Sequence, residues 1–122
     1  MIDHAAVNVS DLEASKQFYE QALKPLGYSL VFQADEFLGY AKGEMPSFGV
    51  ARREPTGGGH VAFAADDHAT VDAFHEAATN AGGTDNGAPG VREHYHPTYY
   101  AAFVRDPDGN NIEAVCHRPP QD

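Results

Sequence analysis

Histidine is the residue type in this sequence that points most directly to chemistry. Seven of the 122 residues are histidine, and imidazole serves both as a metal ligand and as an acid or base near neutral pH. Two of them, His4 and His60, occupy matching places in two similar stretches of the chain, residues 4–27 and 60–83. The composition is a mild hint of metal or acid–base chemistry.

The two stretches are related by a shift of 56 residues. Seven positions of the first are identical in the second, where ordinary residue usage predicts about two. The identical pairs are His4/His60, Ala6/Ala62, Asp11/Asp67, Phe18/Phe74, Glu20/Glu76, Ala22/Ala78 and Gly27/Gly83. An internal repeat predicts that the same supersecondary unit occurs twice.

Each unit begins with a short apolar run of strand length and continues with a helical pattern. Ser10 and Glu13 have the spacing of a capping box at the start of the first helix, and Asp66 or Asp67 caps the second. Apolar residues recur three or four positions apart in both helices, which predicts one buried stripe on each. Glycines at the ends, Gly27 and Gly83, stop them.

Three strands are predicted after each helix. In the first unit they are residues 27–33, 36–42 and 46–53, and in the second they are residues 90–96, 98–105 and 110–117. A turn at 106–111 separates the last two strands. The sequence therefore predicts an α+β fold in a single domain, 1–122, made of two βαβββ modules in tandem, residues 1–53 and 59–118. A glycine-rich linker, residues 54–59, joins them.

At this level the chain resembles the vicinal oxygen chelate superfamily, which includes glyoxalase I, extradiol dioxygenases, and the fosfomycin and bleomycin resistance proteins. The residues that carry the resemblance are 3–23, 60–67 and 101–117. The resemblance covers essentially the whole chain and is more specific for the fold than for the reaction. It implies paired βαβββ modules whose curled sheets form a cup around one site, within one chain or between two.

The resemblance also implies a divalent metal held by His4, His60 and Glu113, from the first, fifth and eighth strands. Alternation along the strands agrees, because each of these residues falls opposite the more apolar face of its strand. Two imidazoles and one carboxylate suit a transition metal with open coordination positions. We expect Fe(II) or Mn(II), with Zn(II) and Ni(II) as alternatives. Some relatives with this fold bind drugs without any metal.

A fourth ligand is missing from the pattern. Glyoxalase I-like relatives carry a carboxylate on the fourth strand, whereas residues 46–53 contain no Asp, Glu or His. The best alignment of the modules places Gly49 opposite Glu113, and Glu44 and Glu54 flank the strand. Three ligands resemble instead the His-His-Glu face of extradiol dioxygenases and fosfomycin-modifying enzymes.

Acid–base candidates lie in "EHYHPTYY", residues 93–100. On the predicted strand His94 and His96 share one face, and either of them or Tyr99 is a candidate acid or base beside the metal. Four arginines are candidates to hold a substrate carboxylate or phosphate, although a solvated surface is the ordinary role of any one: Arg52, Arg53, Arg92 and Arg105. Cys116 falls on the helix side of its strand and is expected to be a small core residue.

Composition excludes several classes of partner. A formal net charge of −10 argues against binding to nucleic acid or to an anionic membrane surface. No apolar stretch is long enough to span a membrane, and the N-terminus lacks a signal-peptide pattern. The single cysteine suits a reducing compartment, so a cytoplasmic location is expected. Because relatives pair across sheet edges, and open edges are a liability, a homodimer is expected.

The expected function is that of a metal-dependent glyoxalase- or dioxygenase-like enzyme. Its substrate would be a small molecule with two neighbouring oxygens, both bound to the metal. One alternative is a glyoxalase I-like lyase that acts on a glutathione hemithioacetal. The other is a metal-free drug- or metabolite-binding protein of the bleomycin-resistance type.

Overall fold

The two predicted modules are present in the computed structural model, which describes residues 1–120. The first contains β1 (Ala5–Val9), α1 (Leu12–Ala22), the short 3-10 helix η1 (Lys24–Leu26), β2 (Ser29–Ala34), β3 (Phe37–Ala41) and β4 (Phe48–Arg52). The second contains β5 (His60–Ala64), α2 (His68–Asn80), β6 (Thr84–Val91), β7 (Tyr100–Arg105) and β8 (Asn111–Cys116). Neither helix of the described residues is long and apolar enough to cross a membrane.

Each module forms its own four-stranded mixed sheet. The strand orders are β1-β4-β3-β2 and β5-β8-β7-β6. The first and last strands of a module pair in parallel, and the other pairings are antiparallel. The prediction of an α+β fold with two βαβββ modules is therefore confirmed. Neither sheet closes on itself, because each keeps two unpaired edge strands.

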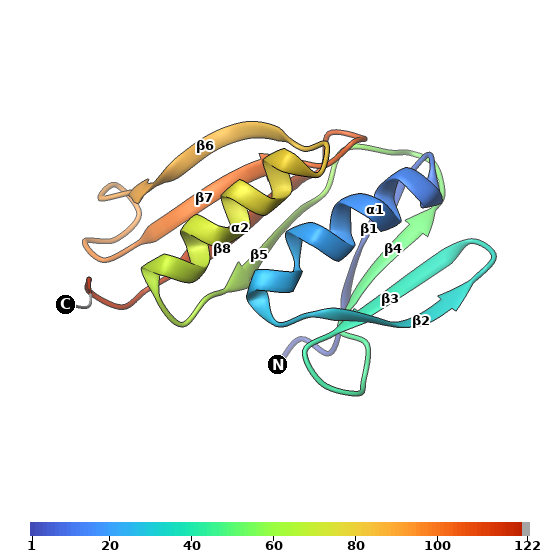
Figure 1. Cartoon of the computed structure of the whole chain (residues 1–122), viewed down its shortest axis with the longest axis horizontal. Helices are drawn as coiled ribbons and strands as arrows, with labels where there is room; N and C mark the ends of the chain where they lie inside the picture. Colours follow the sequence, from blue (N-terminus) through green and yellow to red (C-terminus); the bar gives the residue numbers. More distant parts are fainter. Residues whose placement is uncertain (121–122) are drawn as a thin grey trace.

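The helices cover one face of each sheet. Figure 1 shows α1 and α2 next to each other in front of the two sheets. The buried residues of the helices are three or four positions apart, as an amphipathic helix requires: Ser15, Phe18, Tyr19 and Ala22 in α1, and Val71, Phe74 and Ala78 in α2. Cys116 is fully buried in this core, as predicted.

Among the elements of residues 1–120, no helix lies over the opposite face of each sheet. Alternation along β8 places Ile112, Ala114 and Cys116 in the core, so Asn111 and Glu113 point the other way. On the first sheet the same alternation turns Gly49 away from the core residues Phe48 and Val50. Glu113 and Gly49 therefore lie on the uncovered faces of the two sheets.

One strand of the second module differs from the prediction. The strand expected at 90–96 is β6, which runs from Thr84 to Val91, and the segment after it forms turns. Its composition, TDNGAPGV, has branched residues only at its two ends, Thr84 and Val91, and Asp, Asn, Gly and Pro between them are depleted in strands. Pro89 is tolerated because β6 is an edge strand, and the pairing with β7 is irregular near Gly87. His94 and His96 therefore do not share a strand face.

The first helix begins one residue later than predicted. Its N-cap is Asp11, whose carboxylate accepts a hydrogen bond from the Ala14 backbone N–H at 3.1 Å. Ser10 instead donates its backbone N–H to Asp108 of the second module. In the second module Asp67, rather than Asp66, is the cap and accepts from Thr70 N–H at 2.8 Å. The caps are thus the identical pair Asp11/Asp67 of the repeat.

Candidate functional site

The strand register aligns the two halves of the candidate site. Ala6 lies opposite Gly49 on β1 and β4, and Ala62 lies opposite Glu113 on β5 and β8. Because Ala6 and Ala62 are equivalent in the repeat, Gly49 and Glu113 are equivalent as well. The predicted alignment of Gly49 with Glu113 is therefore confirmed.

Glu113 is the centre of the polar cluster on the second sheet. Only 2% of this residue is exposed. Its Oε1 lies 3.0 Å from Nε2 of His60, whose side chain is 53% exposed. Its Oε2 accepts a hydrogen bond from the Tyr99 hydroxyl. Since a buried carboxylate is costly unless it is paired, His60 and Tyr99 are essential to this arrangement.

Tyr99 is held opposite Arg92 at the end of the β6–β7 pairing. The Arg92 backbone N–H donates to the Tyr99 carbonyl at 2.7 Å. Burial, followed by the hydrogen bond to Glu113 and the charge of Glu113, raises the pKa of the Tyr99 hydroxyl to about 12. The phenol is therefore protonated at neutral pH and serves as a hydrogen-bond donor to the carboxylate.

Tyr99→Phe should remove a stabilisation that is present at neutral pH and is lost at alkaline pH. The raised pKa means that the folded protein holds this proton more tightly than the unfolded chain does. The contribution is therefore complete below about pH 10, the usual tyrosine pKa, and is lost as pH rises toward 12. Urea unfolding at a series of pH values should show wild type more stable than the variant, with the gap narrowing at alkaline pH. A gap that stays constant or widens would contradict this assignment.

The other two acid–base candidates are placed differently. The His96 ring accepts from Thr98 through Nδ1, and the His94 ring packs against Tyr95. Among the contacts of residues 1–120, neither histidine is hydrogen-bonded to Glu113. Of the three candidates, the structure brings Tyr99 alone to the carboxylate.

His4 lies on the other sheet, just before β1. Its Nδ1 is 2.8 Å from a carboxylate oxygen of Asp3, and its side chain is exposed. It lines a cavity of about 320 Å³, whose other walls are Ala6, Phe37, Pro46, Phe48 and Gly49. Within the described residues, no three His, Cys, Asp or Glu side chains are close enough together to hold a metal. Within the described residues of a single chain, His60 lies beside Glu113, but His4 is not close enough to complete a three-residue metal site.

The position of the missing fourth ligand is filled by an aromatic ring. A Cβ atom built on Gly49 would lie 2.5 Å from Cζ of Phe37, far inside contact distance. Phe37 comes from β3 and crosses above the glycine. Sequence reasoning identified the empty position but missed Phe37, because a strand phenylalanine carries no signal of which neighbour it covers.

Comparison with known proteins identifies the family. The model of the Glyoxalase/Bleomycin resistance protein/Dioxygenase superfamily matches residues 1–114. The chain is 32% identical to the uncharacterized protein YqjT of Bacillus subtilis, with 93% of this chain and 96% of YqjT covered. This protein belongs to the Glyoxalase/Bleomycin resistance protein/Dioxygenase superfamily.

Solved structures agree with this assignment. The crystal structure of a glyoxalase/bleomycin resistance protein from Albidiferax ferrireducens is 35% identical, with a TM-score of 0.82 over 93% of this chain and 96% of that one. A lactoylglutathione lyase from Agrobacterium tumefaciens shares the fold at 22% identity, with a TM-score of 0.70 over 95% and 92% of the two chains.

Proposed function

We propose that this protein is a metal-dependent enzyme of the superfamily that binds a small molecule through two neighbouring oxygens. We further propose that it acts as a homodimer, in which the site is completed between two copies. The observation that carries the proposal is the buried Glu113 carboxylate held against His60 on a sheet face that no helix covers. Dioxygenase-type chemistry is the first choice, and a glyoxalase I-like lyase is the second.

The chemistry of His60 and Glu113 supports this proposal, because imidazole nitrogen and carboxylate oxygen are common ligands of divalent transition metals. Oε1 of Glu113 is 3.0 Å from Nε2 of His60, so the two side chains that would hold the metal face one another. The hydrogen bond from Tyr99 occupies Oε2 and leaves Oε1 facing the histidine. A bound metal would act as a Lewis acid that stabilises negative charge on the substrate oxygens.

Each side chain of the cluster has a separate task in this proposal. Glu113 and His60 bind the metal, and His60 is exposed enough to be reached from solvent. Tyr99 is a positioning residue, because its hydroxyl orients the Glu113 carboxylate and keeps its proton at neutral pH. The small Ala62, opposite Glu113, leaves room above the sheet for a ligand.

Two copies are proposed because the two halves of the site lie on different sheets of one chain. His4 stands at an apolar cavity of the first sheet, while His60 and Glu113 stand on the second. Large apolar side chains are exposed on the first module, among them Ile2, Phe32 and Met45. A second copy that places its first sheet over this second sheet would cover apolar surface and supply His4 as the third ligand.

The metal-free binding protein remains the rival from another class. The apolar cavity around Phe37 and Gly49 is the observation that favours it, because a drug or metabolite needs apolar walls more than it needs ligating side chains. Metal binding by the purified protein separates the two proposals.

His60→Ala and Glu113→Gln should each abolish stoichiometric metal binding. Wild-type protein is expected to bind about one divalent ion per chain from Fe(II) or Mn(II), measured by calorimetry under anaerobic conditions and by elemental mass spectrometry. His4→Ala should weaken binding as well, because two ligands alone hold a metal poorly. If metal binding is lost in His60→Ala and Glu113→Gln but not weakened in His4→Ala, His4 is not a ligand.

The matched control is His75→Ala, since His75 belongs to α2 and pairs with Asp85 on the helix side of the sheet. It should bind metal as wild type does. Wild-type protein that stays metal-free with Fe(II), Mn(II), Ni(II) and Zn(II) would favour the binding-protein rival. Light scattering should give twice the 13.1 kDa chain mass, and a monomer at micromolar concentration would rule out the shared site.

A further inference from the structure

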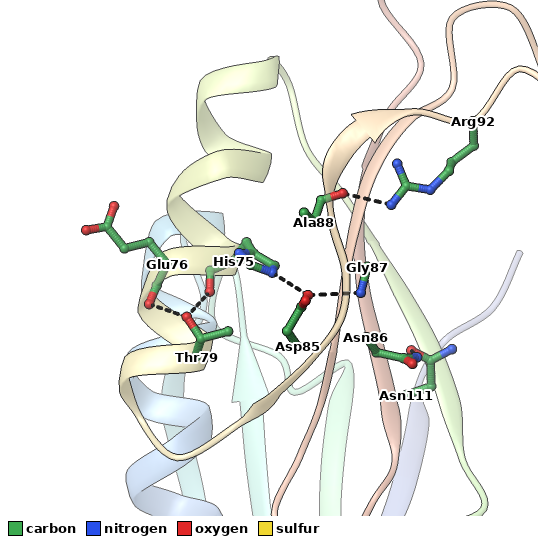
Figure 2. A network of polar contacts seen from close by, with 9 residues as sticks. All are labelled: His75, Glu76, Thr79, Asp85, Asn86, Gly87, Ala88, Arg92 and Asn111. Atoms are coloured by element: carbon green, nitrogen blue, oxygen red, sulfur yellow. Dashed lines mark hydrogen bonds and ion pairs between the residues drawn. The ribbon is translucent and has the colours of Figure 1, made fainter.

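A cation lies on the same sheet face as Glu113. Phe103 is the cross-strand partner of Glu113, and side chains of directly opposed residues share a face. The Arg92 guanidinium carbon is 5.4 Å from the centre of the Phe103 ring. Figure 2 shows Arg92 and Asn111 on one side of β6, with His75 of α2 on the other. Arg92 therefore belongs to the face of the candidate site and not to the core.

The Arg92 side chain is held in place by backbone oxygens. One terminal nitrogen donates to the Gly90 carbonyl and the other to the Ala88 carbonyl, both at 2.8 Å (Figure 2). The guanidinium carries five N–H donors, so donors remain after these two bonds. A rigid fork with free donors is the arrangement that recognises a carboxylate or a phosphate with little loss of side-chain entropy.

The charge of Arg92 is not balanced by an ion pair within residues 1–120. The sequence has 18 Asp and Glu residues against 8 Lys and Arg residues, and Arg52 is paired with Glu36 at 2.7 Å. Among residues 1–120, no carboxylate is paired with Arg92. Glu113 lies on the same face, but both of its oxygens are engaged by His60 and Tyr99. The cation is thus available to an acidic ligand.

We propose that Arg92, packed on Phe103, forms a recognition subsite for an oxyanion that is attached to an apolar group of the substrate. The inference deepens the proposed function, since it assumes that this sheet face binds the substrate, but it does not depend on the metal. The oxyanion, a carboxylate or a phosphate, bonds to the free N–H groups of Arg92. The apolar group packs beside Phe103, and the reacting part of the molecule extends toward its cross-strand neighbour Glu113.

The test uses metal-free protein and two simple acids. Amide chemical shifts are followed by NMR while benzoate, phenyl phosphate or uncharged benzamide is added in the presence of EDTA. Benzoate or phenyl phosphate should shift the amides of β6 and β7 around Arg92, and benzamide should bind more weakly. Arg92→Gln should weaken binding of the two acids by about ten- to a hundredfold, the usual value of hydrogen bonds to a charged group. Arg92→Lys should restore part of the affinity.

Arg105→Gln is the matched control. Arg105 is another arginine of this sheet that bonds a backbone carbonyl, that of Gly109, but it lies at the far end of β7. Its loss should leave acid binding unchanged. A stronger effect of phenyl phosphate than of benzoate would assign the subsite to phosphate esters, and the reverse to carboxylates.

Two results would overturn the inference. One is acid binding by Arg92→Gln equal to that of wild type, with both proteins giving the same dispersed spectrum. The other is wild-type protein that binds neither acid. These measurements are made without metal. If acids bind through Arg92 but the protein has no metal affinity, the metal-dependent enzyme proposal is wrong and the subsite is supported. If the protein binds metal but neither acid, the Arg92 subsite is wrong and the metal-site proposal is unaffected.

Discussion

Asp106→Ala is expected to lower the free energy of unfolding by about 3–5 kcal/mol. Asp106 is 3% exposed and accepts four hydrogen bonds. Its Oδ2 accepts from the Tyr19 hydroxyl at 2.5 Å and from the Asn110 side chain at 2.9 Å. The alanine variant leaves the buried phenol without an acceptor and opens the turn between β7 and β8. Urea denaturation at neutral pH, followed by circular dichroism, measures the loss.

Asp108→Ala is the control in the same turn. Asp108 is less buried and accepts one hydrogen bond from the Ser10 backbone, so its removal should cost about 1 kcal/mol. Tyr19→Phe should cost less than Asp106→Ala, because only one bond is lost. Equal losses for Asp106→Ala and Asp108→Ala would show that the buried pair with Tyr19 contributes little.

Turnover of the glutathione hemithioacetal of methylglyoxal is expected to be slow for the wild-type protein. That isomerisation needs a base to carry a proton between adjacent carbons, and the carboxylate equivalent to Glu113 is replaced by Gly49. Loss of a positioned base costs roughly a hundred- to ten-thousandfold in rate. The assay follows thioester formation with Ni(II), Zn(II) and Mn(II) in turn. Turnover on the order of hundreds per second, as in an efficient enzyme, would make the lyase the first choice.

A matched pair of variants tests why the position is empty. Gly49→Glu should destabilise the protein without adding lyase activity, because its Cβ would collide with the Phe37 ring. Gly49→Glu combined with Phe37→Ala frees that space and should raise both metal affinity and turnover above either single variant. If Gly49→Glu alone performs as well as the double variant, Phe37 is not the obstacle.

The repeat made most of the fold predictable. Identical residues 56 positions apart gave matching strand starts, and period-3.6 patterns gave the helices that α1 and α2 confirm. The exception is β6, an edge strand that contains glycine, proline and asparagine, which are uncommon in strands. It forms because its backbone pairs with β7, and its residue types do not predict it. Residues 90–96 were predicted as the strand instead, and only Gly90 and Val91 of that range belong to β6.

The candidate site was predictable where the two modules could be aligned. That alignment predicted the equivalence of Gly49 and Glu113, which the strand register confirms, and strand alternation predicted the face of Glu113. What brings Tyr99 to Glu113, Phe37 over Gly49 and Arg92 onto Phe103 is packing between different strands. Such contacts depend on side-chain rotamers and strand twist, which cannot be predicted from the residue pattern of a single strand.

The bond between Tyr19 and Asp106 also has a consequence for the order in which the chain is synthesised. The donor lies in the first helix, and the acceptor comes 87 residues later, in the last turn. A nascent chain that has emerged only through the first module holds all the strands of that sheet, but the buried phenol of α1 still lacks its acceptor. Asn110, which donates to the Asn8 carbonyl, arrives at the same late stage. The first module is therefore completed by residues that the ribosome adds only after most of the second module.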